Sequence, residues 1–198
     1  GGDDRHGPES KAPLAVADDE LAKLFRRLIA LKTAGYPVAN SHPYLRTFSH
    51  DEERDPRSYR SGFFGNGLYL LNDILQGDEQ TIGVAARQGE HLKADRVLFR
   101  DGEVYDLLGT PPGHWGWEAR SVYSRSLGRG MVQVFRNHDR RDEIVLRFRG
   151  LEGDATYTVT REDAGTSEQG SGAALMDRGV AVSIPRCFGS EVLRLHRA

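Results

Sequence analysis

The sequence predicts an α+β protein in which helix–strand units are followed by an antiparallel β-sandwich. Before about residue 98, apolar residues recur at helical spacing and short apolar runs follow them. After about residue 102, short alternating segments rich in Val, Ile, Tyr, Phe and Thr are separated by turns containing Gly, Asp or Asn. No helical pattern in this second part is long enough to connect parallel strands. We therefore expect a disordered tail or linker over residues 1–17, helix–strand elements over 18–98 and a sandwich over 99–198.

An amphipathic helix is the first predicted element. Apolar residues occur at i, i+3, i+4, i+7 and i+10 from Leu21, which places them on one face of a helix. Asp18 or Asp19 can cap the first turn, and Gly35 can end the helix in the left-handed conformation. The short apolar segment 36–40 follows directly and predicts a buried strand. A helix joined tightly to a strand is typical of α/β units.

A long polar loop over residues 43–60 separates this unit from the next core segment, 63–71. Loops of this length in compact domains are usually functional or disordered. A second helix is predicted from Asp78 to about Arg96. Its inner face is expected to consist of small and apolar residues, namely Ile82, Ala85, Ala86, Gly89 and Leu92.

The second part of the chain contains the predicted strands. Ile144, Leu146 and Phe148 lie on one face of their segment and the residues between them on the other, which is the two-residue period of a strand. The same reasoning predicts strands at Glu103–Leu108, Gly130–Arg136, Glu143–Arg149, Ala155–Arg161, Val180–Pro185 and Glu191–His196. We expect these strands to close on one another as a sandwich.

Charge and composition disfavour several classes of function. The chain has 27 Lys and Arg residues against 29 Asp and Glu residues, a net charge of −2, which argues against nucleic-acid binding by bulk charge. No apolar run approaches the roughly 18 residues of a membrane span, so we expect no membrane partner. The single cysteine, Cys187, excludes an intramolecular disulfide and is expected to be a core thiol. Residues 1–8 lack an initiator Met and a signal region, which is typical of a piece cut from a longer chain.

The acidic residues of segment 51–55 are one candidate for chemistry. Two carboxylates could serve as acid and nucleophile in glycoside hydrolysis, which needs such a pair roughly 5–10 Å apart. The neighbouring Arg54 and Arg57 favour the alternative, a solvated loop that neutralises its own charge. His42 and His50 could bind a metal ion together with these acids, but their spacing follows no metal-ligand motif. We therefore expect neither a metal ion nor a cofactor.

Aromatic residues and one histidine are further candidates. Trp115, Trp117 and Tyr123 could form a platform that stacks on the apolar face of a sugar ring. The competing interpretation, which the sequence favours, is packing between domains, because a Trp side chain buries a large area. His42 stands at the end of the predicted strand 36–40, where α/β barrels place binding residues.

Nucleotide binding and serine-hydrolase chemistry find no support. Gly65–Gly67 lacks the spacing of a phosphate-binding loop, and no G-x-S-x-G motif is present. His138 lies in a segment, 136–139, that is typical of a hairpin turn, so we expect it to be structural.

Several short motifs follow one another in a characteristic order. In the first part they are Tyr36–Pro37, Ser41–His42, Arg60, Phe64–Gly65, Lys93–Arg96 and Gly102–Leu107. In the second part they are Leu146–Leu151, Ala155–Val159, Ser171–Gly172, Leu175–Met176 and Gly179–Val180. Their order and spacing resemble the closing part of α-galactosidase-like (melibiase-type) glycoside hydrolases. The resemblance covers about residues 20–196, with gaps.

The resemblance implies the terminal elements of a (β/α)8 barrel over residues 18–98, followed by the sandwich. Members of that family retain the anomeric configuration by means of two aspartates on earlier barrel strands. Neither position falls within this chain, so no catalytic residue is assigned. Ser41 and His42 match a strand end at the barrel mouth, and Arg60 matches an arginine after it. The loop 43–60 departs from the family pattern, which leaves the choice of substrate open.

These observations lead to two main expectations of function. The first is a C-terminal fragment of a retaining glycoside hydrolase acting on α-galactoside-type carbohydrates, inactive alone, in which the sandwich supports the barrel. The second is a non-catalytic carbohydrate-binding β-sandwich module, and a structural domain without a ligand is the remaining alternative. The partners would be a carbohydrate and, for the first function, the rest of the barrel or a homo-oligomer partner. The candidate substrate-binding residues are His42, Arg60, Trp115 and Trp117.

Overall fold

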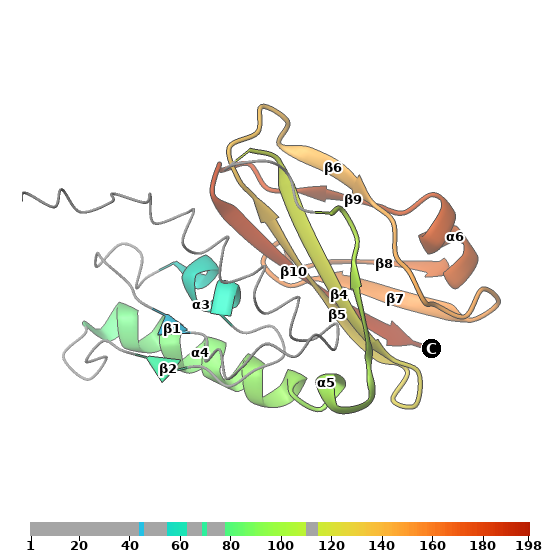
Figure 1. Ribbon diagram of the computed structural model, residues 1–198, viewed down its shortest axis with the longest axis horizontal. Helices are drawn as coiled ribbons and strands as arrows, with labels where there is room; N and C mark the ends of the chain where they lie inside the picture. The colour runs from blue at the N-terminus through green and yellow to red at the C-terminus, as the bar shows by residue number, and fades with distance from the viewer. Residues whose placement is uncertain (1–43, 46–54, 63–68, 71–77, 110–114) are drawn as a thin grey trace, which may run out of the picture.

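The computed structural model describes residues 44–45, 55–62, 69–70, 78–109 and 115–198 (Figure 1). A six-stranded antiparallel sheet lies at the centre of this part of the chain. A two-stranded sheet lies against one face of it, and helices lie against the other. The predicted tail 1–17, the helix that includes Leu21 and the predicted strand 36–40 fall outside the described residues.

The large sheet has the strand order β3–β4–β5–β10–β7–β8, and every neighbouring pair is antiparallel. Its strands are β3 (Glu103–Asp106), β4 (Trp117–Ser124), β5 (Arg129–Arg136), β7 (Thr156–Arg161), β8 (Thr166–Ser171) and β10 (Gly189–Arg197). The alternating patterns predict β3, β5, β7 and β10. Strands β4 and β8 are additional to the prediction.

The second sheet consists of β6 (Glu143–Leu146) and β9 (Val180–Ser183), which are antiparallel. Its inner side chains and those of the large sheet form one apolar core, so the predicted antiparallel sandwich is confirmed. Leu146 and Phe148 are buried in this core, as their alternation predicts. Helix α6 (Gly172–Asp177) closes one edge, and the Ser171 hydroxyl accepts a hydrogen bond from the Ala174 N–H to cap it.

The first part of the chain forms the helical layer. Strand β1 (Tyr44–Leu45) pairs in parallel with β2 (Tyr69–Leu70), and helix α3 (Pro56–Gly62) lies between them in the sequence. Parallel strands need a crossover connection, which accounts for a helix at this point. Helices α4 (Glu79–Asp95) and α5 (Leu98–Asp101) follow, and α5 packs on β4. Among the described residues, no helix is both long and apolar enough to cross a membrane.

Helix α4 confirms the second predicted helix and corrects its orientation. The Asp78 carboxylate accepts a hydrogen bond from the Thr81 N–H at 2.9 Å, and Arg96 is the C-cap. Ile82, expected on the inner face, is 41% exposed. The buried residues of α4 are Thr81, Val84, Gln88 and Asp95. The prediction is wrong for Ile82 and Ala86, which are exposed, whereas Ala85 and Leu92 are half-buried and pack against the cluster of Val84 and Tyr59. Helix α4 also buries polar side chains because it covers a partly polar surface.

Helix α3 replaces the end of the predicted loop 43–60. Asp55 precedes it, and its carboxylate accepts a hydrogen bond from the Arg57 N–H at 2.9 Å. Pro56 occupies the first helical position, where a missing N–H costs nothing. The sequence Asp-Pro is thus the start signal of this helix. Cys187, expected in the core, is only half-buried, and its thiol donates to the Asp139 carbonyl at 3.7 Å.

Candidate functional site

The face of the large sheet that points away from the sandwich core is partly polar, yet buried. Side chains alternate along a strand, so Trp117 and Ala119 of β4 point into the core while Glu118 and Arg120 point to the opposite face. The strand register places Arg120 beside Gln133 on this second face. Buried polar groups need partners within the protein. Helices α3 and α4 cover this face, and α3 supplies part of those partners.

Arg60 of α3, a predicted site residue, joins the helical layer to the sandwich. Its side chain is 3% exposed and forms a two-pronged ion pair with Asp163 in the β7–β8 turn, at 2.5 and 2.8 Å. It also donates to the Ser190 hydroxyl of β10 at 3.1 Å. A planar guanidinium that binds both oxygens of one carboxylate fixes orientation as well as distance. The described contacts of Arg60 therefore hold α3 in place.

Arg194 of β10 makes the second connection between the layers. It pairs with Asp95 of α4, and its Nε donates to Glu162 at 2.8 Å. His91 Nδ1 lies 2.8 Å from the other oxygen of Glu162. Burial lowers the pKa of Arg194, but the hydrogen bond and charge of Asp95, followed by those of Glu162, outweigh it and leave the pKa above its ordinary value. Arg194 is therefore a permanent positive charge between two carboxylates.

A third link lies at the start of α3. Arg57 donates to the Asn137 side-chain oxygen at 2.8 Å, and the Asn137 amide donates to Glu118 at 2.7 Å. Asn137 is fully buried. One amide thus connects the buried Glu118 of β4 to the guanidinium of α3, and it uses both its donor and its acceptor group to do so.

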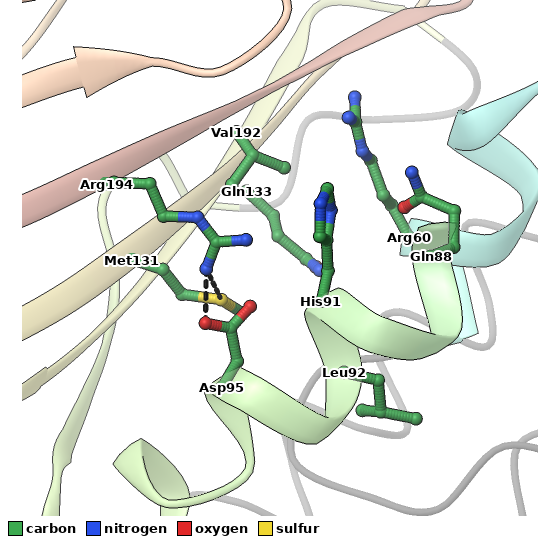
Figure 2. A pocket seen from close by; sticks show the side chains of 9 residues that line it. All are labelled: Arg60, Gln88, His91, Leu92, Asp95, Met131, Gln133, Val192 and Arg194. Carbon is green, nitrogen blue, oxygen red and sulfur yellow. Dashed lines mark hydrogen bonds and ion pairs between the residues drawn. The ribbon is translucent and has the colours of Figure 1, made fainter. Parts of the chain in front are cut away.

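A small cavity remains between α4 and the sheet (Figure 2). Its walls include Asp95 and His91 of α4, together with Gln133 and Arg194 of the sheet. The space open to the centre of a water molecule is about 20 Å³. One water molecule needs about 10–15 Å³ on this measure, so the cavity has room for water but not for a sugar ring.

The remaining predicted site residues fall into different environments. Trp117 is 5% exposed and Tyr123 is 3% exposed, and both side chains belong to the sandwich core, so both residues have a packing role. Trp115 is 52% exposed at the start of β4 and lies against His138. His42 falls outside the described residues.

Two further sequence candidates concern acids and metals. Asp55, one acid of the predicted acidic loop, forms an ion pair with Arg186, while the other acids of that loop fall outside the described residues. Within the described ranges, no group of three or more His, Cys, Asp or Glu residues could hold a metal ion.

Apart from Arg60, which the family resemblance singles out, the residues that connect the two layers carry no specific signal in the sequence. Arg60 and Asp163 are separated by 103 positions, and Arg194 and Asp95 by 99. No periodicity or motif marks such a pair, because each partner looks like an ordinary charged residue of a helix or strand. The only signal is the set of charged residues within β10 and its neighbours, where apolar residues are the norm.

Comparisons with known proteins agree with this fold. No family model and no curated protein matches the chain. The galactosidase domain of an α-galactosidase-sucrose kinase matches with a TM-score of 0.67 at 22% identity, over 89% of this chain and 25% of that one. An α-galactosidase from Lactobacillus brevis gives 0.65 at 18% identity, over 88% and 25%. A GH36 α-galactosidase from Geobacillus stearothermophilus in complex with raffinose gives 0.68 at 20% identity, over 89% and 24%.

These matches define the fold class. The chain has the fold of a part of the GH36 α-galactosidases and spans about a quarter of the length of the structures it matches. The resemblance found in the sequence motifs is therefore confirmed at the level of the fold. The match extends over helices and sandwich together, because it covers nearly nine-tenths of this chain.

Proposed function

We propose that this chain is the C-terminal portion of a retaining glycoside hydrolase that acts on α-galactoside-type carbohydrates. In this proposal, the residues before about 98 are the last elements of a (β/α)8 barrel, and the sandwich supports that barrel. The order β1–α3–β2–α4 and the parallel pairing of β1 with β2 support a barrel end. The catalytic aspartates would lie on barrel strands outside this chain, so the chain alone would be inactive.

The buried polar face of the large sheet carries the proposal. A free-standing sandwich would leave this face to water, whereas here it binds two helices through Arg60, Arg194 and Asn137. Buried charges that are paired in a defined geometry specify how two layers meet more strictly than apolar contacts do. The sandwich is thus built to hold a helical layer in one position, which is what a barrel needs from a supporting domain.

A partial barrel would also need a partner for the edges of its strands. A parallel pair of two-residue strands, such as β1 and β2, has unpaired backbone groups along both edges unless other strands join it. The remainder of the barrel would supply those strands, and a second copy of the chain is the alternative source.

The experiment compares the chain alone with the chain joined to the polypeptide encoded immediately upstream of it. The chain alone should not hydrolyse p-nitrophenyl α-galactopyranoside. The longer protein should hydrolyse it, and proton NMR should detect the α-anomer as the first product, as retention requires. Hydrolysis with inversion, or activity restricted to another class of bond, would contradict the proposal.

A further inference from the structure

Three ring side chains gather at the end of the sandwich where β4 begins, β5 ends and β10 begins. The register that pairs Trp117 with Arg136 and Arg136 with Gly189 brings the neighbouring residues of these strands together. Trp115 and His138 have ring centroids 4.4 Å apart at an angle of 54°, and His138 lies parallel to Phe188, within 9°, at 6.2 Å. We call Trp115, His138 and Phe188 the aromatic strip.

The aromatic strip is exposed, and the backbone beneath it is firmly held. Trp115 is 52% exposed and Phe188 is 36% exposed. The Gly116 N–H donates to the His138 carbonyl at 3.3 Å, and the Asn137 N–H donates to the Gly116 carbonyl at 2.9 Å. These bonds tie the Trp115 segment to the His138 segment. The rings are therefore presented to solvent on a fixed support.

Arg136 fixes the third segment of the strip. Its buried guanidinium donates to the carbonyls of Ile184 and Pro185 at 2.7 Å each, and to the Asp139 carbonyl at 2.8 Å. One side chain thus joins the loop after β5 to the loop after β9. A binding surface that is organised before the ligand arrives loses less conformational entropy on binding.

Phe188 adopts a backbone conformation that is costly for its residue type. Its φ is +57°, and it is the one non-glycine residue with positive φ in the described part of the chain. Bulky residues rarely occupy this region, and strained residues concentrate at functional sites. The Phe188 ring lies beside His138 and is 36% exposed, so it is not part of the core.

Charged groups border the strip. The buried Arg57 guanidinium lies over the Phe188 ring, with its central carbon 5.4 Å from the ring centre, so it covers one face of that ring. Arg186, two residues before Phe188, is 70% exposed and forms an ion pair with Asp55. This pair offers hydrogen-bond donors and acceptors at the edge of an aromatic surface, which is the combination that orients a ligand with one apolar face and a polar rim.

We propose that the aromatic strip is a non-catalytic binding site for carbohydrate, in which the apolar face of a pyranose ring lies on the exposed Trp115 indole, His138 and Phe188 hold that indole in place, and the sugar hydroxyl groups bond to the Asp55–Arg186 pair. Three rings bordered by charges are too few for a stable protein partner, which uses about 20–30 residues a side. Arg186 and Arg141 each have an acidic partner, which disfavours a phosphate backbone. The site goes beyond the proposed hydrolase function, since no bond is broken there.

The test titrates the full chain with a panel of sugars: methyl α-galactoside, raffinose, and oligosaccharides of glucose and of mannose. Intrinsic tryptophan fluorescence and saturation-transfer NMR report binding. Because Trp115 is the exposed tryptophan of the pair, saturable binding should change its emission, with a Kd on the order of 1 mM for a small surface site. Trp115→Ala and Phe188→Ala should each weaken binding at least about tenfold.

Leu127→Ala is the matched control, because Leu127 is 41% exposed in the turn between β4 and β5, at the opposite end of these strands. It should leave sugar binding unchanged. Circular dichroism should show that all variants are folded. Phe188→Asn removes the ring but keeps a residue that tolerates positive φ. It should also lose binding, which would show that the loss comes from the missing ring and not from a change in the backbone.

The inference is overturned if no sugar of the panel binds, or if Trp115→Ala and Phe188→Ala bind as the unchanged chain does. It is also overturned if Trp115 instead mediates self-association in analytical ultracentrifugation or binds an oligonucleotide. Binding of glucose or mannose oligosaccharides, but not of a galactoside, would still support the binding site. The hydrolase proposal is tested separately, by the activity of the chain joined to its upstream polypeptide. The two proposals therefore fail in separate experiments.

Discussion

Individual side chains in this protein have sharply different roles despite similar chemistry. Trp115 and Trp117 are two residues apart, but one is half-exposed on the aromatic strip and the other is buried in the sandwich core. Arg136 and Arg186 differ in the same way, since the first fixes backbone carbonyls from inside and the second pairs with Asp55 at the surface. Position on the pleat and at the strand end, rather than residue type, decides these roles.

Alanine substitution of the two tryptophans should have very different effects on stability. Trp117→Ala removes a buried indole from the core and should lower the free energy of unfolding by about 3–5 kcal/mol. Trp115→Ala acts at an exposed site and should lower it by about 0.5 kcal/mol or less. Urea denaturation followed by circular dichroism measures both. Equal losses would show that Trp115 is also part of the core.

The raised pKa of the Tyr123 phenol leads us to expect that the protein loses stability in alkali. Burial, followed by the hydrogen bond to Tyr157, raises the pKa of Tyr123 above its ordinary value of 10.0. The unfolded chain therefore releases this proton at lower pH than the folded chain does, so the stability that the protonated phenol contributes is full below pH 10 and falls as the pH rises further.

Urea denaturation at pH 8, 10 and 11 should detect this decline. Tyr123→Phe should flatten it, at a cost of about 1 kcal/mol at pH 8 for the lost hydrogen bond. If the free energy of unfolding of Tyr123→Phe fell with pH as steeply as that of the unchanged chain, another titrating group would be responsible for the decline.

At the scale of elements, local signals account for α4 and β6. Asp78 marks the start of α4, and the alternation of Leu146 and Phe148 marks the buried face of β6 and the residues after it. Strand β4 alternates only from Trp117 to Arg120, and the pattern breaks at Ser121 and Val122. All eight of its residues are buried, with the sandwich core on one face and the helices on the other. Strand β8 has no large apolar residue and is exposed along most of its length, so nothing in its composition indicates a strand.

The cap of α4 can be tested directly. Asp78→Ala leaves the Thr81 N–H without its side-chain acceptor and should lower stability by about 1 kcal/mol. Asp78→Asn keeps an acceptor oxygen and should retain most of that stability. Hydrogen exchange of the first amides of α4 and urea denaturation measure the effect. An asparagine variant as unstable as the alanine variant would indicate that charge, rather than the cap, is responsible.

For the whole molecule, the arrangement depends on ion pairs between distant segments. Arg60 with Asp163 and Arg194 with Asp95 hold the helical layer on the sheet. The sequence predicts both layers and the antiparallel sandwich, but it cannot predict how they meet, because the partners are ordinary charged residues about a hundred positions apart. Of the candidate site residues, Trp115 alone stands on the aromatic strip, whose other members have no sequence signal.

Breaking one ion pair should release the helices while the sandwich stays folded. Arg60→Met leaves Asp163 without its partner, and because the Asp163 side chain is 44% exposed the cost should lie between that of a surface pair and that of a buried pair, about 1–2 kcal/mol. Hydrogen exchange should become faster in α4 and remain slow in β5 and β10. Arg100→Met is the control, since Arg100 forms an exposed pair with Asp101 and should change stability by about 0.5 kcal/mol or less. Equal acceleration in helices and strands would show that the two layers unfold as one unit.

The left-handed backbone at Phe188 has a consequence for anyone engineering this protein. Glycine adopts that conformation freely, whereas phenylalanine there costs on the order of 1–3 kcal/mol. A library selected for heat resistance alone should therefore enrich glycine or asparagine at this position. Variants from such a library would be more stable to heat but would bind sugar more weakly. Stability and sugar binding therefore need to be selected together.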